Sequence, residues 1–253
     1  MAIAGIILAA GRSKRMKSER VKVLCNLNGR PILSYVIDAV KDCGIEKIFV
    51  VVGHQAESVR EKFQESDIEF VEQKERLGTA HAVDQTRNYL YNFKGEILVL
   101  CGDTPLIQAS TLKELHRKHK ESKADITLLT SIIDNPPGYG RIIRDGDGSI
   151  EAIIEDKDTT ADQRKIKEIN AGVYCFNKKI LFDLLPQITC NNKQKEYYLT
   201  DIIGLAKKEN FRLEGFLIAE FNETRGINTQ EELAQVGKVF ENRAGCFNGK
   251  VFL

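Results

Sequence analysis

The loop that follows the first apolar run carries groups suited to phosphate binding. Leu8-Ala9-Ala10-Gly11 leads into a basic stretch that ends in Lys14 and Arg15, and Lys22 follows shortly after. Small residues let a backbone approach a ligand closely, and successive loop N–H groups cradle phosphate oxygens. The spacing matches neither a G-x-G-x-x-G nor a G-x-x-x-x-G-K-[ST] motif. An ordinary strand-to-helix turn with a solvated basic face is the alternative.

A carboxylate stands at the end of another apolar run. Asp103 follows Ile97–Cys101 and Gly102, and the glycine frees the backbone to turn there. One carboxylate, together with phosphate oxygens and water, is a usual way to hold Mg²⁺. The competing interpretation is an aspartate that only caps the next turn.

A third candidate combines Gln73 with Leu77-Gly78-Thr79-Ala80. A glutamine amide has two donors and an acceptor, which suits the edge of a pyrimidine base. Thr79 could equally be the N-cap of the next helix.

The histidines and cysteines give weaker indications of a metal-binding or catalytic site. His116 and His119 have the spacing of a metal pair, but no third ligand is evident, so a solvated helix face is the preferred interpretation. His54 and His81 are isolated, and a lone histidine is more often structural. The six cysteines contain no C-x-x-C pair, which favours reduced thiols in a cytosol.

Alternating strands and helices must position these residues. In the first half, β-branched apolar runs alternate with segments of helical periodicity. The predicted strands are Ile3–Ala9, Lys47–Val52, Ile68–Val71 and Ile97–Cys101, and the predicted helices are Pro31–Cys43, Ala56–Gln64 and Thr79–Tyr91. This order predicts a mainly parallel sheet covered on both faces, which binds ligands beyond the carboxyl ends of its strands.

The second half predicts an extension of mixed direction. A hairpin is expected at Arg141–Arg144 and Ser149–Glu155, around Asp145-Gly146-Asp147-Gly148. Further strands are expected at Asp125–Ile132, Ile169–Phe176 and Leu213–Phe221, and helices at Leu199–Lys207 and Glu231–Phe240. No break in composition separates the halves, so a single α/β domain is expected.

Composition excludes several classes of protein. Of 253 residues, 42% are hydrophobic and 29% charged, which argues against wholesale disorder and against collagen or coiled-coil repeats. Lys+Arg 37 against Asp+Glu 36 leaves a net charge of +1, unlike a dedicated nucleic-acid binder. The apolar run Ile3–Ala10 is too short to span a membrane and lacks the basic region that precedes a signal-peptide core. We therefore expect a cytoplasmic protein with neither nucleic acid nor membrane as partner.

Taken together, the motifs resemble the sugar-nucleotide pyrophosphorylases. Within them, the chain is most similar to the uridylyltransferase half of the bifunctional bacterial N-acetylglucosamine-1-phosphate uridylyltransferase/glucosamine-1-phosphate acetyltransferases, from about Ile3 to Asn228. The opening loop is shared with cytidylyl-, guanylyl- and thymidylyltransferases. The narrower strings are Gly138-Tyr139-Gly140-Arg141, Ile169-Asn170-Ala171-Gly172 and Glu196-Tyr197-Tyr198-Leu199-Thr200-Asp201, and Gly226-Ile227-Asn228 completes the match.

The resemblance implies a nucleotide-diphospho-sugar transferase fold, a Rossmann-like mixed, mainly parallel sheet flanked by helices. It implies Mg²⁺-dependent transfer of UMP from UTP to N-acetylglucosamine 1-phosphate, giving pyrophosphate and UDP-N-acetylglucosamine for peptidoglycan synthesis. Residues 1–228 would form the nucleotidyltransferase domain, and residues 229–253 a C-terminal helix and tail. The bifunctional relatives carry a trimerising β-helix acetyltransferase domain; no such repeat is found, so the oligomeric state stays open.

The resemblance also assigns roles to residues. Lys22, Arg15 and Asp103 would be catalytic, with Asp103 and Asn228 holding Mg²⁺, and Gln73 would read uracil. The implied substrate-binding residues are Leu8, Ala10, Gly11, Gln73, Gly78, Thr79, Gly102, Tyr139, Gly140, Glu155, Asn170 and Tyr198. Of these, Gly140, Glu155 and Asn170 would bind the sugar, with the two tyrosines nearby.

Departures from the family pattern occur at Ser13, Val21, Cys101 and Arg225, and none removes an implied ligand. Alternatives that stay open are another sugar phosphate or nucleotide, and a non-catalytic nucleotide-sugar-binding homologue. A glycosyltransferase would need a D-x-D metal motif, and Asp145-x-Asp147, in the expected hairpin turn, offers only weak support.

Overall fold

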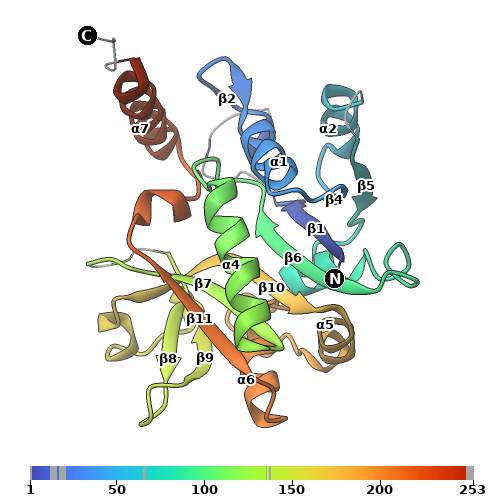
Figure 1. Cartoon of the computed structure of the whole chain (residues 1–253), viewed down its shortest axis with the longest axis vertical. Coiled ribbons are helices and arrows are strands. Elements are labelled where there is room, and N and C mark those ends of the chain that lie inside the picture. The colour runs from blue at the N-terminus through green and yellow to red at the C-terminus, as the bar shows by residue number, and fades with distance from the viewer. Residues whose placement is uncertain are drawn as a thin grey trace.

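A nine-stranded mixed sheet forms the centre of the molecule (Figure 1). The computed structural model describes residues 2–11, 16, 21–64, 67–134, 136 and 138–248, with the backbone alone for 242–248. The main path of the sheet runs β11-β7-β10-β6-β1-β4-β5, and the hairpin β8–β9 branches from β10. These strands are β1 (Ala2–Ala9), β4 (Lys47–Val52), β5 (Glu69–Glu72), β6 (Gly95–Cys101), β7 (Ile126–Ile132), β8 (Arg141–Arg144), β9 (Ile150–Ile154), β10 (Glu168–Asn177) and β11 (Leu213–Ile218). A separate two-stranded ribbon joins β2 (Asn26–Leu27) and β3 (Arg30–Pro31).

Strand direction confirms the predicted mixed, mainly parallel sheet. Strand β1 pairs in parallel with β4 and β6, β4 with β5, and β11 with β7. Strand β10 is antiparallel to both β6 and β7 and joins the two parallel sets. The carboxyl ends of β1, β4, β5 and β6 therefore meet at one edge, where ligands of open α/β sheets bind.

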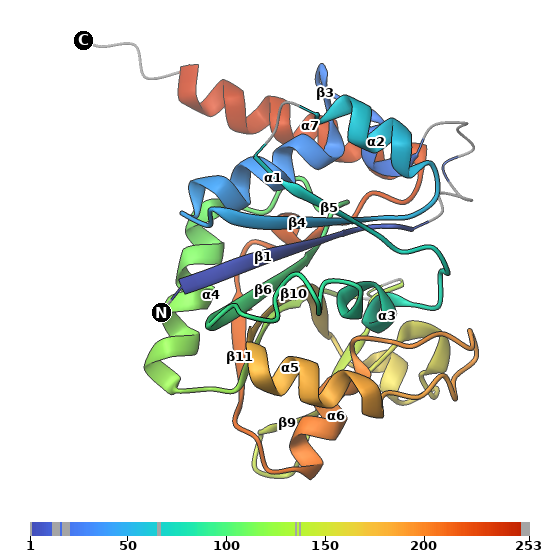
Figure 2. The ribbon, with the colours of Figure 1, turned by 90° about the vertical axis from the view of Figure 1, so that its right-hand side faces the viewer.

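Helices cover both faces of the sheet (Figure 2). One face packs against α1 (Ile32–Asp42), α2 (Ala56–Lys62) and α4 (Ala109–Ser122), and the other against α3 (Thr79–Asp84), α5 (Lys178–Leu184) and α6 (Asp201–Lys208). In β6, Ile97 and Val99 join the second core, whereas Leu98 and Leu100 join the first. Burial on both sides explains why these strands are continuous apolar runs rather than alternating ones.

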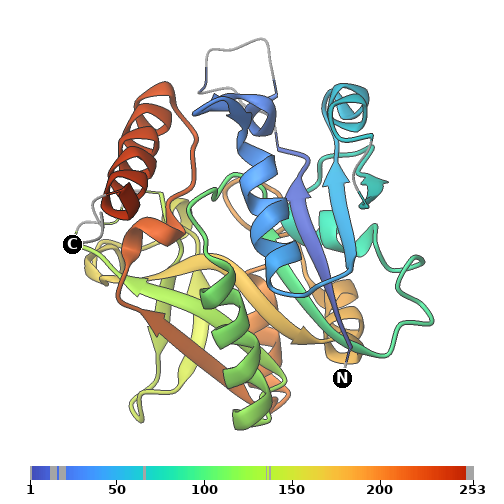
Figure 3. The ribbon, with the colours of Figure 1, turned by 45° about the horizontal axis from the view of Figure 1, so that its top comes forward.

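The last helix, α7 (Gln230–Asn248), packs beside the N-terminal part of the chain. Val236 is buried in a third apolar cluster with Met16, Leu27, Ile32 and Ile227. Figures 1 and 3 show α7 at the same end of the molecule as α1. Within the described ranges, no helix combines the length and hydropathy needed to cross a bilayer.

The predicted helix Thr79–Tyr91 is too long, because α3 ends at Asp84 and turns follow it. Thr86 Oγ1 donates to the Val83 carbonyl at 2.7 Å, and such a side-chain bond competes with the helical backbone pattern.

The expected solvated face of the His116/His119 segment is also wrong in part. The segment is helical, as α4, but His119 is only 3% exposed and lies 2.9 Å from Thr127 Oγ1. His116 pairs with Glu96, so both rings face the sheet instead of solvent. Desolvation lowers the pKa of His119, which favours a neutral ring.

Candidate functional site

A cavity of about 950 Å³ opens at the carboxyl ends of β1 and β6. Its walls carry both signs of charge, from four cationic and three anionic side chains. The lining residues are Leu8, Ala9, Ala10, Gly11, Lys22, Val23, Gln73, Lys74, Glu75, Arg76, Gly78, Thr79, Ala82, Cys101, Asp103, Lys157, Gln194, Glu196 and Asn228. Mixed charge suits a ligand that carries phosphates together with a metal ion.

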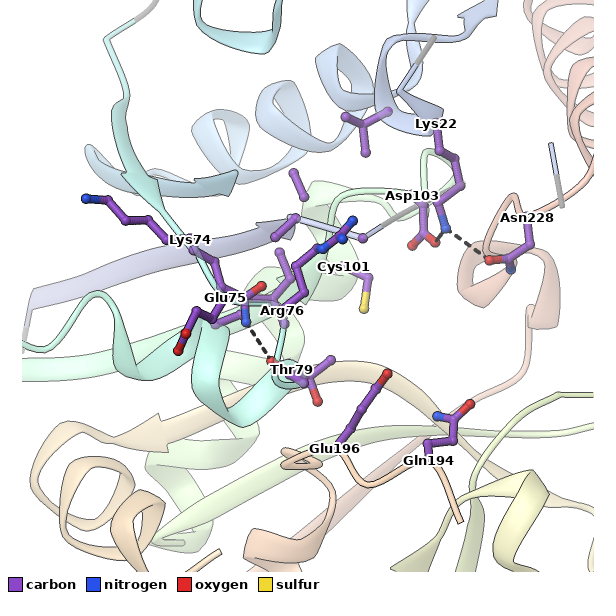
Figure 4. A pocket seen from close by; sticks show the side chains of 18 of the residues that line it. Lys22, Lys74, Glu75, Arg76, Thr79, Cys101, Asp103, Gln194, Glu196 and Asn228 are labelled. Atoms are coloured by element: carbon purple, nitrogen blue, oxygen red, sulfur yellow. Dashed lines mark hydrogen bonds and ion pairs between the residues drawn. The ribbon is translucent and has the colours of Figure 1, made fainter. Parts of the chain in front are cut away.

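At one end of the cavity, the Lys22 ammonium joins three distant segments (Figure 4). It forms an ion pair with Asp103 and donates to Asn228 Oδ1 at 3.0 Å. The side chains of Lys22 and Asp103 are only 15% and 18% exposed, so this pair is shielded from screening by salt. The buried Val23 anchors the short 3₁₀ turn Lys22–Leu24 that presents the lysine.

Hydrogen bonds to backbone carbonyls fix the loop that carries Asp103. Thr104 Oγ1 donates to the Cys101 carbonyl at 2.9 Å, and Ile227 N donates to the Asp103 carbonyl at 2.9 Å. The second bond sets Asn228 beside Asp103. The carboxylate itself contacts Lys22, and the turn is held by Thr104, so the alternative of a turn-capping aspartate is not what the structure shows.

A capping box holds Asn228 from the other side. Glu232 Oε2 accepts from the backbone N–H groups of Asn228 and Thr229, at 2.5 and 3.0 Å, while Glu232 N donates to Thr229 Oγ1 at 3.1 Å. This reciprocal pattern starts helix α7 and satisfies N–H groups that a helix start leaves unpaired. Asn228 is therefore held by the first turn of a helix.

The Asp103–Asn228 pair fits a hard divalent metal. A carboxylate and an amide oxygen converge on one cationic group, and oxygen is the donor that Mg²⁺ prefers. Among the described residues, no cluster of three or more His, Cys, Asp or Glu side chains is arranged to hold a metal. Phosphate oxygens and water would have to complete the coordination.

Gln73 and the Gly78 loop line the opposite end. Gln73 is buried, and its Nε2 donates to the Gly78 carbonyl at 2.9 Å. Gly78 has φ +121°, and a Cβ there would lie 2.4 Å from the Tyr197 carbonyl oxygen, so only glycine fits. Thr79 Oγ1 accepts from Leu199 N at 2.9 Å, so Thr79 is not the N-cap of α3.

Several predicted sugar-site residues gather beside this cavity but are not part of its lining. Asn170 N donates to the Gly140 carbonyl at 2.9 Å, and Asn170 Nδ2 donates to the Tyr174 hydroxyl at 2.6 Å. Glu155 accepts from Thr200 Oγ1 at 2.9 Å, and burial raises the pKa of its carboxyl group, opposed by that bond.

The side chains of Tyr198 and Cys101, which lie near this group, both have raised pKa values. Tyr198 is buried, and desolvation raises its pKa to about 12, with Asp158 and Glu155 adding to the shift. Cys101 lines the cavity, and burial, aided by the Asp103 charge, raises its pKa to about 12. This shift favours the protonated thiol, which is the less nucleophilic form.

Two other predicted residues, Tyr139 and Gly102, lie near the Lys22 end of the cavity. Tyr139 packs edge-on against Phe221 at 5.9 Å between ring centroids. Burial raises its pKa, against a hydrogen bond with the Gly226 backbone that lowers it. Gly102 is buried behind Asp103, where its N–H donates to the Leu8 carbonyl at 2.9 Å.

The cavity thus brings together most of the predicted nucleotide and metal residues. They are Leu8, Ala10, Gly11, Lys22, Gln73, Gly78, Thr79, Asp103 and Asn228. Gly102, Tyr139, Gly140, Glu155, Asn170 and Tyr198 lie around it, and Arg15 lies outside the described residues.

Sequence reasoning missed several lining residues. Lys74, Arg76 and Gln194 belong to no motif. Arg76 stands between Gln73 and Gly78, and this position in the sequence could have indicated that it lines the cavity. Arg141 was also not predicted to hold the backbone of the loop that precedes it. Only 2% exposed, its guanidinium bonds the carbonyls of Tyr139 and Pro136 and pairs with Asp156 at 3.2 Å.

The family model described as the MobA-like NTP transferase domain matches residues 5–156 of the chain. The chain belongs to this family. It is therefore a nucleotidyltransferase, and its sheet is the nucleotide-diphospho-sugar transferase fold. Enzymes of this kind use a divalent metal, in agreement with the oxygen pair at Asp103 and Asn228.

Relatives named "Bifunctional protein GlmU" are similar over nearly the whole chain. The protein of Geotalea daltonii (strain DSM 22248 / JCM 15807 / FRC-32) is 46% identical over 242 residues, which is 95% of this chain and 53% of the relative. Those of Geobacillus sp. (strain WCH70) and Bacillus cereus (strain G9842) are each 45% identical over 238 residues, 94% of this chain and 52% of the relative. The chain spans about half the length of these curated relatives.

The half-buried Asp201 predicts a pH dependence of stability. Burial, and then Asp158, raise its pKa to about 6, above the value of about 3.9 expected in the unfolded chain. The folded state thus binds this proton more tightly, and stability falls as pH rises from about 4 to 6. We expect Asp201→Asn to raise the free energy of unfolding at pH 7.5 by about 1 kcal/mol, after allowing for solvent screening.

Urea unfolding at pH 4 and pH 7.5 measures this effect. The gain should shrink to a small fraction near pH 4, where the folded state is protonated and the unfolded state is about half protonated. Asp162→Asn, at a carboxylate that is 91% exposed, is the matched control. A gain of equal size at both pH values would show that Asp201 destabilises the fold by something other than its charge.

Proposed function

We propose that the chain transfers UMP from UTP to N-acetylglucosamine 1-phosphate in the presence of Mg²⁺, releasing pyrophosphate. The observation that carries this proposal is the convergence of Lys22, Asp103 and Asn228 at one end of a cavity whose other end holds Gln73. A cation site and a base-reading amide in one cavity suit a nucleoside triphosphate. Similarity to the proteins named GlmU supports the uridylyl and sugar assignments.

The reaction needs no general base from the protein. An oxygen of the sugar phosphate, already anionic at neutral pH, forms a bond to the α-phosphorus of UTP. The bond from that phosphorus to the bridging oxygen breaks, and pyrophosphate leaves with the electron pair. The barrier is repulsion between anions, so positioning and electrostatic stabilisation carry catalysis.

Lys22 is the described residue best placed to offset this repulsion. Its ammonium is now held by Asp103 and Asn228, the same two oxygens that would hold the metal. Lys22 must therefore release them when the metal binds, which leaves its charge for the triphosphate. One charge pair at 4 Å is worth about 4 kcal/mol at an effective dielectric near 20, before desolvation. Bound Mg²⁺ would supply Lewis-acid polarisation of phosphate oxygens.

Gly140, Glu155 and Asn170 would bind the sugar. They lie beside the cavity and near Cys101, whose thiol pKa is raised by burial and by the charges of both Asp103 and Glu155. The second candidate within the same class is another hexose 1-phosphate or nucleotide, because none of the described contacts of these three residues singles out an acetamido group.

A substrate panel tests the function. Purified chain with Mg²⁺ is given each of four nucleoside triphosphates with each of three hexose 1-phosphates, and pyrophosphate release is measured. We expect UTP with N-acetylglucosamine 1-phosphate to give the highest kcat/KM. Asp103→Ala should abolish release while circular dichroism shows an intact fold, and Asp147→Ala, in the exposed hairpin turn, should retain full activity. Another preferred pair would replace the proposed substrates, and no turnover of any pair would favour a non-catalytic binding protein.

Lys22 is predicted to act mainly in the transition state. Lys22→Ala should lower kcat by about 10²-fold or more while changing KM for UTP much less, because its charge matters most as pyrophosphate leaves. Steady-state kinetics at saturating sugar phosphate measure both constants. Lys179→Ala, on the exposed surface of α5, is the control. A rise in KM with unchanged kcat would assign Lys22 to ground-state binding only.

A further inference from the structure

Three side chains form a hydrogen-bonded chain at the Gln73 end of the cavity. Gln73 Nε2 lies 2.9 Å from the Gly78 carbonyl oxygen and 3.0 Å from His81 Nδ1. His81 Nε2 lies 3.2 Å from the Gln85 amide. Gln73 itself is only 4% exposed, so its amide cannot turn freely into water.

The contact with the Gly78 carbonyl determines the orientation of the Gln73 amide group. A carbonyl oxygen can only accept, so the Gln73 atom beside Gly78 must be the NH₂ group. Its second hydrogen points to His81 Nδ1, which must then be unprotonated and accept. In the tautomer that accepts at Nδ1, the ring proton lies on Nε2. Gln85 can accept that proton through its amide oxygen, by turning and giving up its 3.1 Å bond to the His81 carbonyl.

The other end of the Gln73 amide is left for a ligand. No described residue donates a hydrogen bond to its Oε1, and this atom is not among the fully buried polar atoms without a partner. Since Gln73 lines the cavity, the accessible part of its amide is an acceptor.

We propose that His81 is a positioning residue that sets base specificity: by accepting the second Gln73 N–H, it fixes Oε1 as the group shown to the pyrimidine. Oε1 then accepts from the N3–H of uracil. Cytosine presents an unprotonated N3, and two acceptors would face each other. This inference rests on the proposed use of UTP and adds His81 to the residues that select it.

Loss of His81 weakens the constraint without removing Gln73. In His81→Ala, only the Gly78 carbonyl would hold the NH₂ group, and one N–H would lose its buried partner. Rotation of the amide then becomes less costly, and a rotated amide can donate to N3 of cytosine. Selection against CTP should therefore fall.

Equilibrium binding of UTP and of CTP, each with Mg²⁺, tests this by calorimetry on the intact chain. We expect His81→Ala to reduce the ratio of the CTP to the UTP dissociation constant by about tenfold, the size of one lost hydrogen bond. His81→Asn places an amide oxygen near the position of Nδ1 and should keep the ratio within about threefold of the original. Circular dichroism and thermal melting monitor folding.

Each outcome has a distinct meaning. Equal weakening of UTP and CTP in His81→Ala, or an unchanged ratio, would overturn the role of His81 and leave the proposed function standing. Failure of the unmodified chain to bind UTP would overturn the proposed function itself. If His81→Ala does not fold, His81→Phe is the second variant: it keeps a ring of similar size without an acceptor at the Nδ1 position, and a ratio that stays unchanged there contradicts the proposal.

Discussion

The ammonium of Lys22, held between the Asp103 carboxylate and the Asn228 amide oxygen, is the interaction on which the site depends. It links residues 81 and 206 positions away along the chain. A carboxylate and an amide oxygen that converge without a cation would repel each other. Their convergence therefore marks a place built for positive charge, which the lysine supplies in this structure. If a divalent metal uses the same oxygens, as we propose, metal binding and the release of Lys22 toward phosphate are coupled.

The fold supplies the three parts of this interaction from separate elements. The parallel strand β6 delivers Asp103 at the edge of the sheet where β1 also ends. Asn228 arrives from the far end of the chain, and its backbone is fixed by the capping box with Glu232 and by the bond from Ile227 to Asp103. Upstream, buried Glu223 accepts from Gln108 and Thr111, which ties the preceding turn to the start of α4. Specific polar contacts thus set the geometry that the apolar core only supports.

Local sequence pattern predicted the parts of the fold that depend on burial. The apolar runs of β1, β4 and β6 were recognisable because both faces of each strand are covered, and the rule on carboxyl ends placed Asp103 correctly at the cavity. The length of α3 was not predictable in this way, since the helix ends within a stretch of helical periodicity, next to the bond from Thr86 to the Val83 carbonyl. Burial of His119 likewise depends on how α4 packs on the sheet, which its own charge pattern does not reveal.

The site was predicted less completely than the fold. Asn228 has no local signal as a ligand, and only the resemblance to sugar-nucleotide pyrophosphorylases pointed to it. Arg76 and Gln194 line the cavity because of the paths of their loops, and no periodicity encodes those paths. The proposed role of His81 depends on the orientation of the Gln73 amide, which follows from its contacts with Gly78 and His81 and not from any local sequence pattern.

The most direct test of the central claim is a crystal structure of the chain with UTP and Mn²⁺, in which the anomalous signal locates the metal. We expect a metal peak bound by the Asp103 carboxylate and Asn228 Oδ1, with the Lys22 ammonium moved onto the triphosphate. A structure in which Lys22 still bridges Asp103 and Asn228, while the metal binds elsewhere, would contradict it.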